Sequence, residues 1–348
     1  MSVTFHVPGP LRPFTGGLSE VEIAGSPATL QEALEGLWTL YPGLRDRVVT
    51  EQGRIRPHVN VFVGNEHIRN TGELATQLSP AAEISIVPAV SGGGGATKYV
   101  RYRKDSTTAY GILEGALIRE IRGDLFGARE ETGAAHPLSS VKLLHPCEPS
   151  KILAVGRNYK SHLGDRQQPD RPEMFYKPVS ALQHPEEPIV IPPDAADVHF
   201  EGELVIVVGQ RVSRASPGEA RAAIFGVTCG NDVSERDWQN GPRKDLQWWR
   251  AKGADTFAPL GPAIVTGLDY GNLMLETRLN GEVVQKQSTA DLTFDCPAIV
   301  RWVSRWVTLV PGDAIYTGTP GSTRPMKPGD IVEVEIEGIG VLRNRVDQ

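Results

Sequence analysis

The sequence is poor in cysteine and has no long apolar run. Its three cysteines, Cys147, Cys229 and Cys296, are far apart and form no C-x-x-C pair, which argues against a disulfide scaffold and a structural zinc finger. The longest unbroken apolar run, residues 204–208, is far shorter than the ~20 residues that cross a bilayer. The N-terminus shows no charged segment followed by an apolar one, so we expect neither a secretory signal nor membrane attachment.

The chain also lacks any block of basic residues. Its formal net charge is −6 over 348 residues, which disfavours nucleic-acid binding. Unpaired cysteines are typical of a reducing compartment, so we expect a cytoplasmic protein. At ~100–200 residues per domain, the length predicts two domains or one large one.

Lysine is absent from the first 97 residues and common after them. The change falls next to four consecutive glycines at residues 92–95, a composition typical of flexible linkers. We therefore predict a first domain at residues 1–91, a linker at 92–97 and a second domain at 98–348.

Apolar spacing predicts strands and one helix in the first domain. Alternation predicts a strand at residues 3–7, a third strand at 59–63 and a last one at 84–88. Leucines at helical spacing predict a helix that Ser26 could cap, with Pro27 at its first position. We expect Pro42 and Gly43 to end this helix.

Three stretches of the first domain resemble the β-grasp sulfur carriers, namely the small subunit of molybdopterin synthase and the thiamine-pathway carrier. They are VFVGNEHIR from Val61, Thr71-Gly72 with Leu78, and ISIVPAVSGG ending at Gly93. The resemblance implies a ubiquitin-like β-grasp fold. Carriers of this family react through the carboxylate of a terminal glycine, whereas Gly93 is internal here. Proteolysis would be needed to free it, so we favour a structural role or a role in docking onto a partner, such as an adenylating enzyme, over sulfur transfer.

The second domain is predicted to be mostly β, with few helices. Short β-branched and apolar stretches recur between glycines and prolines. One helix is expected after Ser216, Pro217 and Gly218. Another is expected near residues 290–309, where Ile299, Trp302, Val303 and Trp306 lie on one helical stripe. The fold class expected for the whole chain is α+β.

Three carboxylates mark a candidate metal site. Glu201 and Glu203, in HFEGELVIVVG, are two residues apart and project from the same face of a strand. Asp232 ends another apolar run, AIFGVTCGND. Three carboxylates brought together would repel one another without a cation, and oxygen ligands favour Mg²⁺ or Mn²⁺ over zinc.

Two further groups of residues are candidates for chemistry. His162 and Asp165, in the loop GRNYKSHLGD, are three apart, so a helical turn would let the carboxylate orient the imidazole. Lys252 is flanked in sequence by aromatic side chains that could partly desolvate it. We also single out Lys177 and the run NDVSERDWQ, which contains Arg236 and Gln239, as well as Thr319 in YTGTPGS.

Residues 98–348 resemble the fumarylacetoacetate hydrolase superfamily. The motifs that carry this resemblance are GRNYKSH, FYKPVSAL, HFEGELVIVVG, GNDVSERDWQ, KGADTFAPLGP, TRLNGE, YTGTPGS and GDIVEVEIEGIGVLRN. The resemblance implies a barrel-like fold of rolled sheets, a homodimer, and a Mg²⁺ or Mn²⁺ site at Glu201, Glu203 and Asp232. It also implies that His162 is the catalytic lid residue. Asp165 stands where the family commonly has a glutamate.

The substrates implied by the resemblance are small 2-oxo acids. Arg236, Gln239 and Thr319 would orient the carboxylate and the oxo group, and Arg157 or Lys177 would meet the distal end. His162, oriented by Asp165, would activate a water, and Lys252 would help to stabilise the developing negative charge. We expect C–C hydrolysis of an acylpyruvate-like acid. An oxaloacetate-type decarboxylase, a dienedioate isomerase and a non-catalytic interaction protein remain as alternatives.

Overall fold

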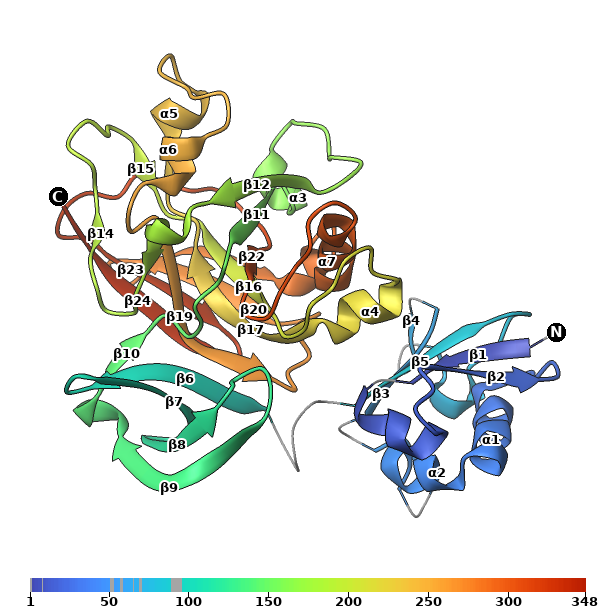
Figure 1. Ribbon diagram of the computed structural model, residues 1–348. Coiled ribbons are helices and arrows are strands. Elements are labelled where there is room, and N and C mark those ends of the chain that lie inside the picture. Colours follow the sequence, from blue (N-terminus) through green and yellow to red (C-terminus); the bar gives the residue numbers. More distant parts are fainter. Residues whose placement is uncertain are drawn as a thin grey trace. The chain divides into compact units, whose positions relative to one another are not determined.

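The computed structural model describes residues 2–7, 9–50, 53–56, 59–64, 66–68, 71–88 and 96–348. The chain divides into two compact units (Figure 1), one of residues 1–94 with Ser216–Ala222 and one of the remaining residues. This agrees with the predicted two-domain architecture. Most of the predicted linker, including Gly93, lies outside the described residues, so its role stays a prediction.

The described strands of the first unit form one mixed sheet in the order β2-β1-β5-β3-β4. The strand β1 pairs antiparallel with β2 and parallel with β5, and β5 pairs antiparallel with β3. This is the predicted β-grasp arrangement, and its core is apolar. The elements are β1 (Ser2–His6), β2 (Glu20–Ala24), α1 (Leu30–Leu40), α2 (Pro42–Val48), β3 (Val59–Val63), β4 (Glu66–His67) and β5 (Glu83–Pro88).

The helix of this unit begins later than the sequence analysis expected. Its N-cap is Thr29, whose side chain accepts a hydrogen bond from the Glu32 N–H, so neither Ser26 nor Pro27 begins it. Pro42 does not simply end the helical segment, because it occupies the first turn of α2. A proline at the start of a helix loses no hydrogen bond there, which explains why Pro42 separates two helices.

Residues 96–348 are all described and contain three sheets. The largest has the strand order β12-β11-β22-β16-β17-β19-β6-β7-β8-β9, with β10 beside β6 and β13 beside β19. A second sheet has the order β14-β24-β23-β20-β21, and β15 pairs with β18. The strands of the large sheet are β6 (Thr97–Lys104), β7 (Thr107–Glu114), β8 (Leu117–Gly123), β9 (Arg129–Pro137), β10 (Lys142–Leu144), β11 (Ile152–Gly156), β12 (Glu173–Lys177), β13 (Leu182–Gln183), β16 (Gly202–Val208), β17 (Ile224–Asn231), β19 (Ala258–Thr266) and β22 (Ala314–Tyr316).

The other strands and the helices are short, as predicted for a mostly-β domain. They are β14 (Ile189–Val190), β15 (Val198–His199), β18 (Ser234–Glu235), β20 (Met274–Leu279), β21 (Glu282–Ser288), β23 (Ile331–Ile336), β24 (Gly340–Asp347), α3 (Lys160–Leu163), α4 (Pro217–Ala222), α5 (Arg236–Asn240), α6 (Trp249–Gly253) and α7 (Cys296–Ser304). In the described part of the chain, no helix has the length and apolar character needed to span a membrane.

The strand β16 runs through the centre of the large sheet. All of its residues are buried, as expected of a strand that is apolar on both faces. It pairs antiparallel with both β17 and β22. The start of β16 therefore lies beside the end of β17, and this geometry sets the position of the site.

Candidate active site

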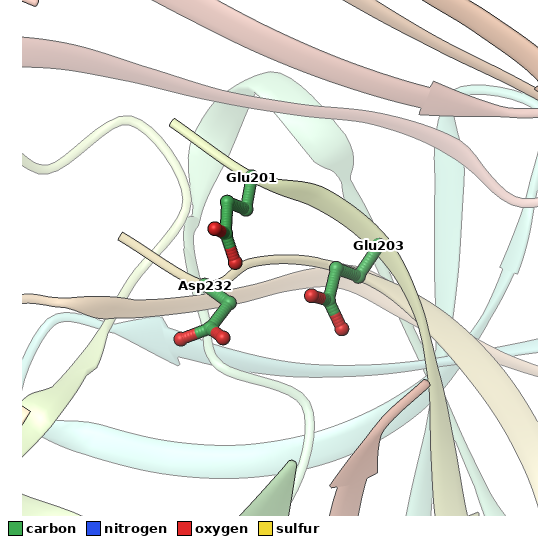
Figure 2. Close-up of side chains that lie close together, drawn as sticks. All are labelled: Glu201, Glu203 and Asp232. Atoms are coloured by element: carbon green, nitrogen blue, oxygen red, sulfur yellow. The ribbon is translucent and has the colours of Figure 1, made fainter. Parts of the chain in front are cut away.

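Three carboxylates meet where β16 begins and β17 ends (Figure 2). Antiparallel pairing places Glu203 opposite Gly230, and the backbone N–H of Asp232 donates to the carbonyl of Glu201 at 2.8 Å. Carboxylate oxygens of Glu201, Glu203 and Asp232 lie within 4.8 Å of one another, and all three residues are buried. The structure thus brings the three predicted metal ligands together.

Gly202, between the two glutamates, permits a close approach of β20. A Cβ at this position would lie 2.0 Å from Oγ1 of Thr277, well inside any van der Waals contact. The face of β16 that the sequence leaves bare is therefore filled by another strand. This packing fixes the direction in which Glu201 and Glu203 project.

Three cationic side chains surround the acidic cluster. Lys252 Nζ donates to Glu201 Oε2 and to Asp232 Oδ2, each at 2.7 Å. Lys177 Nζ donates to Asp232 Oδ1, and Arg236 Nη2 lies 2.6 Å from Glu201 Oε1. Both lysines are buried, so they form charge-assisted hydrogen bonds away from solvent.

These contacts shift the pKa values of the buried groups. Burial alone would raise the pKa of Glu201, but Lys252 and Arg236 together hold it well below its ordinary range. Burial would lower the pKa of Lys252, but the carboxylates of Asp232 and Glu201 raise it. Burial dominates at Lys177 and lowers its pKa despite Asp232.

Glu203 is the member of the cluster with no ion pair to a described cationic side chain. Its Oε2 accepts a hydrogen bond from the backbone N–H of Gly318 at 2.7 Å. Burial and the neighbouring carboxylates of Asp232 and Glu201 raise its pKa well above the ordinary value. A divalent cation among the three carboxylates would offset this repulsion, and oxygen-only ligands suit a hard cation. The donor set therefore fits a bound divalent metal ion.

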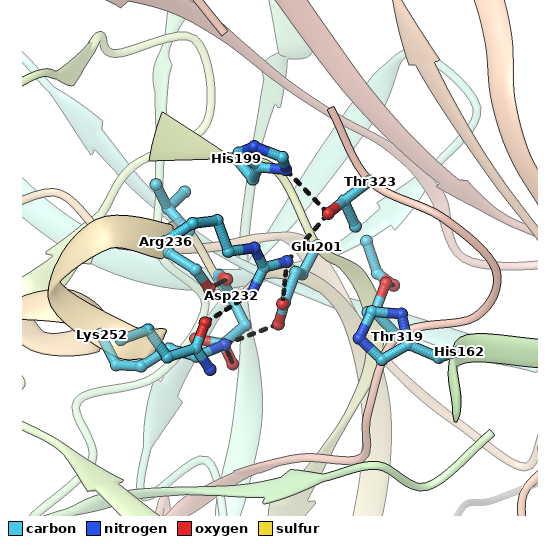
Figure 3. A network of polar contacts seen from close by, with 12 residues as sticks. His162, His199, Glu201, Asp232, Arg236, Lys252, Thr319 and Thr323 are labelled. Atoms are coloured by element: carbon cyan, nitrogen blue, oxygen red, sulfur yellow. Dashed lines mark hydrogen bonds and ion pairs between the residues drawn. The ribbon is translucent and has the colours of Figure 1, made fainter. Parts of the chain in front are cut away.

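His162 faces the cluster from α3 (Figure 3). Its Nδ1 lies 2.6 Å from the carbonyl oxygen of Gly321, so Nδ1 carries a proton and donates it, leaving Nε2 as an acceptor in the neutral ring. Asp165 is exposed and has no hydrogen bond to His162 among the described residues. The predicted pairing of His162 with Asp165 is not formed, because the backbone carbonyl takes the place expected for the carboxylate.

The predicted substrate-binding residues fall into different environments. Arg236 Nη1 donates to Gln239 Oε1 at 2.6 Å, so these two lie together at the cluster. The hydroxyl of Thr319 donates to the carbonyl of Gly202 at 2.9 Å. Arg157 Nε instead donates to Glu173 at 2.8 Å, and no described contact joins Arg157 to the acidic cluster.

Lys177 lies within the acidic cluster. The sequence predicts that Arg157 or Lys177 meets the distal end of a substrate. In the structure Lys177 is enclosed beside Asp232, with 2 % of its surface exposed. Its ammonium group supports a predicted metal ligand, and a role in contacting substrate stays a prediction.

One loop, residues 317–325 between β22 and β23, contacts several parts of the site. Besides the contacts of Gly318, Thr319 and Gly321 already described, Thr323 Oγ1 accepts a hydrogen bond from Arg236 Nη2 at 2.9 Å. We call this segment the 317–325 loop. It contacts the predicted metal ligand Glu203, the imidazole of His162 and the guanidinium of Arg236.

Sequence reasoning missed three side chains at the site. Gln285 donates to Oγ1 of Thr319 at 2.9 Å, and the backbone N–H of Gly202 donates to the Gln285 side chain at 3.2 Å. His199 and Thr323 form a hydrogen bond of 2.9 Å. His199 lies two residues before Glu201 in a motif already singled out, whereas nothing in the sequence around Gln285 indicates its role.

Comparison with known proteins identifies the family of the larger unit. Residues 151–347 match the family model described as fumarylacetoacetate (FAA) hydrolase, C-terminal. The chain belongs to the fumarylacetoacetate hydrolase family. Residues 97–146 match the Rv2993c-like N-terminal model, and residues 5–93 match the ThiS family, which confirms both predicted resemblances.

Relatives of this fumarylacetoacetate hydrolase family member carry several names. Protein Rv2993c of Mycobacterium tuberculosis is 46% identical over 233 residues, which cover 66% of this chain and 87% of that protein. The mitochondrial oxaloacetate tautomerase FAHD2A of Bos taurus is 41% identical, covering 60% and 71%. A solved structure of 5-carboxymethyl-2-hydroxymuconate delta-isomerase from Mycobacterium smegmatis is 44% identical with a TM-score of 0.67, covering 72% and 99%. The chain is therefore similar to enzymes named for keto–enol or double-bond isomerisation.

Proposed function

We propose that the chain is a metal-dependent tautomerase that interconverts the keto and enol forms of a small 2-oxo dicarboxylic acid such as oxaloacetate. The observation that carries this proposal is the hydrogen bond between His162 Nδ1 and the Gly321 carbonyl. It holds Nε2 as the proton acceptor without a carboxylate partner. The relatedness to a protein named oxaloacetate tautomerase supports the same assignment.

The environment of His162 suits a proton shift better than hydrolysis. Tautomerisation moves one proton between the carbon next to the oxo group and the oxo oxygen, and it consumes no water. His162 Nε2 can take the proton from one atom and return it to the other. C–C hydrolysis requires an activated water, and catalytic histidines that activate a nucleophile are usually stabilised as imidazolium by a carboxylate. No described carboxylate hydrogen-bonds to His162.

The charge of the site favours a dianionic substrate. The three carboxylates of the cluster are balanced by Lys177, Lys252 and Arg236. With a divalent cation held by Glu201, Glu203 and Asp232, the site would carry two net positive charges, which attract a dicarboxylate more strongly than a monoanion. The ion, which we propose to be Mg²⁺ or Mn²⁺, would supply Lewis-acid stabilisation of an enolate.

In this proposal, the side chains of Arg236 and Gln239 bind a carboxylate of the substrate. Arg236 has five N–H donors, of which Gln239, Glu201 and Thr323 take three. The remaining donors, together with the amide N–H groups of Gln239, can orient a substrate carboxylate. Lys252 uses two of its three donors on Glu201 and Asp232 and keeps one for a developing negative charge.

C–C hydrolysis of an acylpyruvate is the second candidate. It is favoured by Asp165, which is exposed three residues after His162 and has no ion pair or hydrogen bond among the described residues. A rearrangement of the loop at residues 156–165 would bring the carboxylate of Asp165 toward the ring of His162. Decarboxylation of oxaloacetate requires the same enolate stabilisation, so the experiment must separate all three reactions.

The test follows enol oxaloacetate in the ultraviolet, with Mg²⁺ or Mn²⁺ and with chelator, while NMR identifies the products. Faster metal-dependent loss of the enol without pyruvate supports the tautomerase. Pyruvate from oxaloacetate indicates a decarboxylase, and cleavage of acetylpyruvate to acetate and pyruvate indicates the hydrolase. The proposal is contradicted if the protein with Mg²⁺ or Mn²⁺ does not speed the loss of the enol beyond the rate in buffer with the same metal ion.

We also propose that the ThiS-like unit docks onto a partner protein and that the chain forms a homodimer. An internal Gly93 has no free carboxylate for adenylation, which favours docking over sulfur transfer. Intact-mass measurement of the chain from its native host tests this directly, because a species ending at Gly93 would support the carrier role. Sedimentation of the purified protein tests the dimer.

A further inference from the structure

A chain of hydrogen bonds leads from Asp197 at the protein surface to the guanidinium of Arg236. Figure 3 shows the part from His199 through Thr323 to Arg236. Asp197 Oδ1 lies 2.9 Å from His199 Nε2. His199 Nδ1 lies 2.9 Å from Thr323 Oγ1, which in turn accepts from Arg236 Nη2 at 2.9 Å. These four side chains come from β15 and its preceding residue, from the 317–325 loop and from the start of α5.

The chemistry of the four groups fixes the direction of each hydrogen bond. A guanidinium only donates, so Thr323 Oγ1 is the acceptor from Arg236. The carboxylate of Asp197 only accepts, so His199 carries its proton on Nε2. A neutral imidazole holds one proton. Nδ1 of His199 therefore accepts a hydrogen bond from the hydroxyl group of Thr323. Each of these three hydrogen bonds thus joins one donor to one acceptor.

The backbone alone does not determine where the guanidinium lies. The strand β15 pairs antiparallel with β18, with His199 opposite Ser234, and the backbone N–H of Arg236 donates to the carbonyl of Asp197 at 2.9 Å. This anchors the main chain of Arg236 next to β15. Its long side chain has many rotamers, and Thr323 and Gln239 are the uncharged groups that hold its end.

We propose that His199 is a positioning residue for Arg236, acting through the hydroxyl of Thr323. The inference rests on the proposed function in one respect, namely that Arg236 binds a carboxylate of the substrate. Because His199 Nδ1 accepts the hydrogen bond of the Thr323 hydroxyl group, a lone pair of Thr323 Oγ1 points toward Arg236. The guanidinium is then oriented before substrate arrives, and less entropy is lost on binding.

Paired substitutions at Thr323 test the relay. Thr323→Val has nearly the same shape but neither donates nor accepts, whereas Thr323→Ser keeps the hydroxyl. We expect Thr323→Val to raise KM for oxaloacetate, and Kd for oxalate measured calorimetrically with Mn²⁺, by about tenfold, with kcat within about twofold. Thr323→Ser should match the unmodified protein. Thr266→Val serves as the control, because the buried hydroxyl of Thr266 has no hydrogen-bond partner among the residues that the structure describes.

Two substitutions at His199 separate its nitrogens. Asparagine places an acceptor near the position of Nδ1, so His199→Asn should retain most of the oxalate affinity. Glutamine reaches the position of Nε2 and leaves Thr323 without its acceptor, so His199→Gln should behave like Thr323→Val. Equal loss in both variants would overturn the proposal, because it would show that only the ring volume matters.

Imidazole nitrogen NMR gives a readout that needs no substrate. His199, identified by loss of its signals in His199→Asn, should show a protonated Nε2 and a bare Nδ1, and Thr323→Val should shift the Nδ1 resonance. A proton on Nδ1 would overturn the relay. Failure of the unmodified protein to bind oxalate, or unchanged oxalate binding by Thr323→Val, would overturn it as well. Normal oxalate results without oxaloacetate turnover would reject only the proposed tautomerase.

Discussion

Glu203 occupies an unusual position for a buried carboxylate. Glu201 and Asp232 each contact two cationic side chains, whereas Glu203 contacts the backbone N–H of Gly318. A buried charge without a partner is costly. The raised pKa of Glu203 is the expression of that cost in protein without metal, and a bound cation would remove it.

Replacing Glu203 with glutamine should therefore have opposite effects on metal affinity and on stability in chelator. Loss of one anionic ligand should weaken Mn²⁺ binding by at least about 10- to 100-fold, since even groups that only support ligands contribute that much. In chelator, the variant should melt at a higher temperature than the unmodified protein near neutral pH. Titration calorimetry and thermal melts measure the two effects.

The difference in melting temperature between the unmodified protein and the Glu203→Gln variant should depend on pH. Because the pKa of Glu203 is raised in the folded state, the unfolded chain loses this proton first, near its ordinary pKa of about 4.3. Stability of the unmodified protein falls as pH rises from there toward the folded-state pKa, and the uncharged amide of the Glu203→Gln variant removes that loss. The two melting temperatures should converge at low pH. Glu130→Gln, in an exposed ion pair with Arg122, should change neither quantity, and a destabilised Glu203→Gln protein in chelator would contradict the argument.

The sequence predicts the strand β16, but it does not predict the contacts that pack around this strand. Five consecutive apolar residues and the two glutamates before them predict the buried strand and its acidic start. The contacts that fix it come from distant residues, since Thr277 and Gln285 follow Gly202 by more than seventy positions. Such contacts depend on how sheets pack, which local periodicity does not encode.

The sequence predicts the helix α7 but not the residue at which it ends. The sequence predicts a helix whose apolar stripe includes Ile299, Val303 and Trp306. The structure buries Ile299 and Val303, but the helix ends at Ser304 and Trp306 is 67% exposed. Trp306 packs edge-on against Trp302 with ring centroids 4.8 Å apart. Helical spacing alone does not predict where a helix ends.

Gly202→Ala tests the packing of β16 against β20. The added methyl group would meet Thr277 Oγ1, so Thr277 or the backbone of one strand must shift. We expect the glutamates on either side of position 202 to move with it. Overpacking of this kind costs about 1–3 kcal/mol, and Mn²⁺ affinity should fall with it. Thermal melts and Mn²⁺ titration give both readouts.

A double substitution supplies the control for this prediction. In the described part of the chain, the hydroxyl of Thr277 has no hydrogen-bond partner, so Thr277→Ala alone should cost little stability. Combined with Gly202→Ala, it removes the closest clash and should restore part of both stability and metal affinity. Strictly additive effects in this double-mutant cycle would show that the clash is not the cause.

At the scale of the whole molecule, the sequence indicates two domains more clearly than it indicates why they are joined. The change in lysine content and the glycine run predict a division, and the β-grasp and fumarylacetoacetate hydrolase resemblances are both confirmed. The described apolar core of the first unit is built from side chains between residues 3 and 86. Nothing local in either part encodes the reason for the fusion.

The chain beginning at residue 96 should therefore fold and react without the ThiS-like unit. Solved relatives match 72% of this chain over 99% of their own length, so chains of about that size fold into solved structures. We expect its kcat with oxaloacetate to lie within about twofold of that of the full chain, with the metal affinity unchanged. Steady-state kinetics and Mn²⁺ titration of both proteins check this. A tenfold loss of kcat in a folded protein would instead show that the first unit takes part in catalysis.

The 317–325 loop has a consequence for how such enzymes diverge. It contacts Glu203 through Gly318, His162 through Gly321 and Arg236 through Thr323. We propose these three side chains as metal ligand, proton carrier and carboxylate anchor. A small change in this backbone would move three functional groups together while leaving β16 and β17 in place. Loops tolerate such changes better than central strands do. Sequence changes confined to this loop would thus alter the reaction while the three carboxylates stay in place.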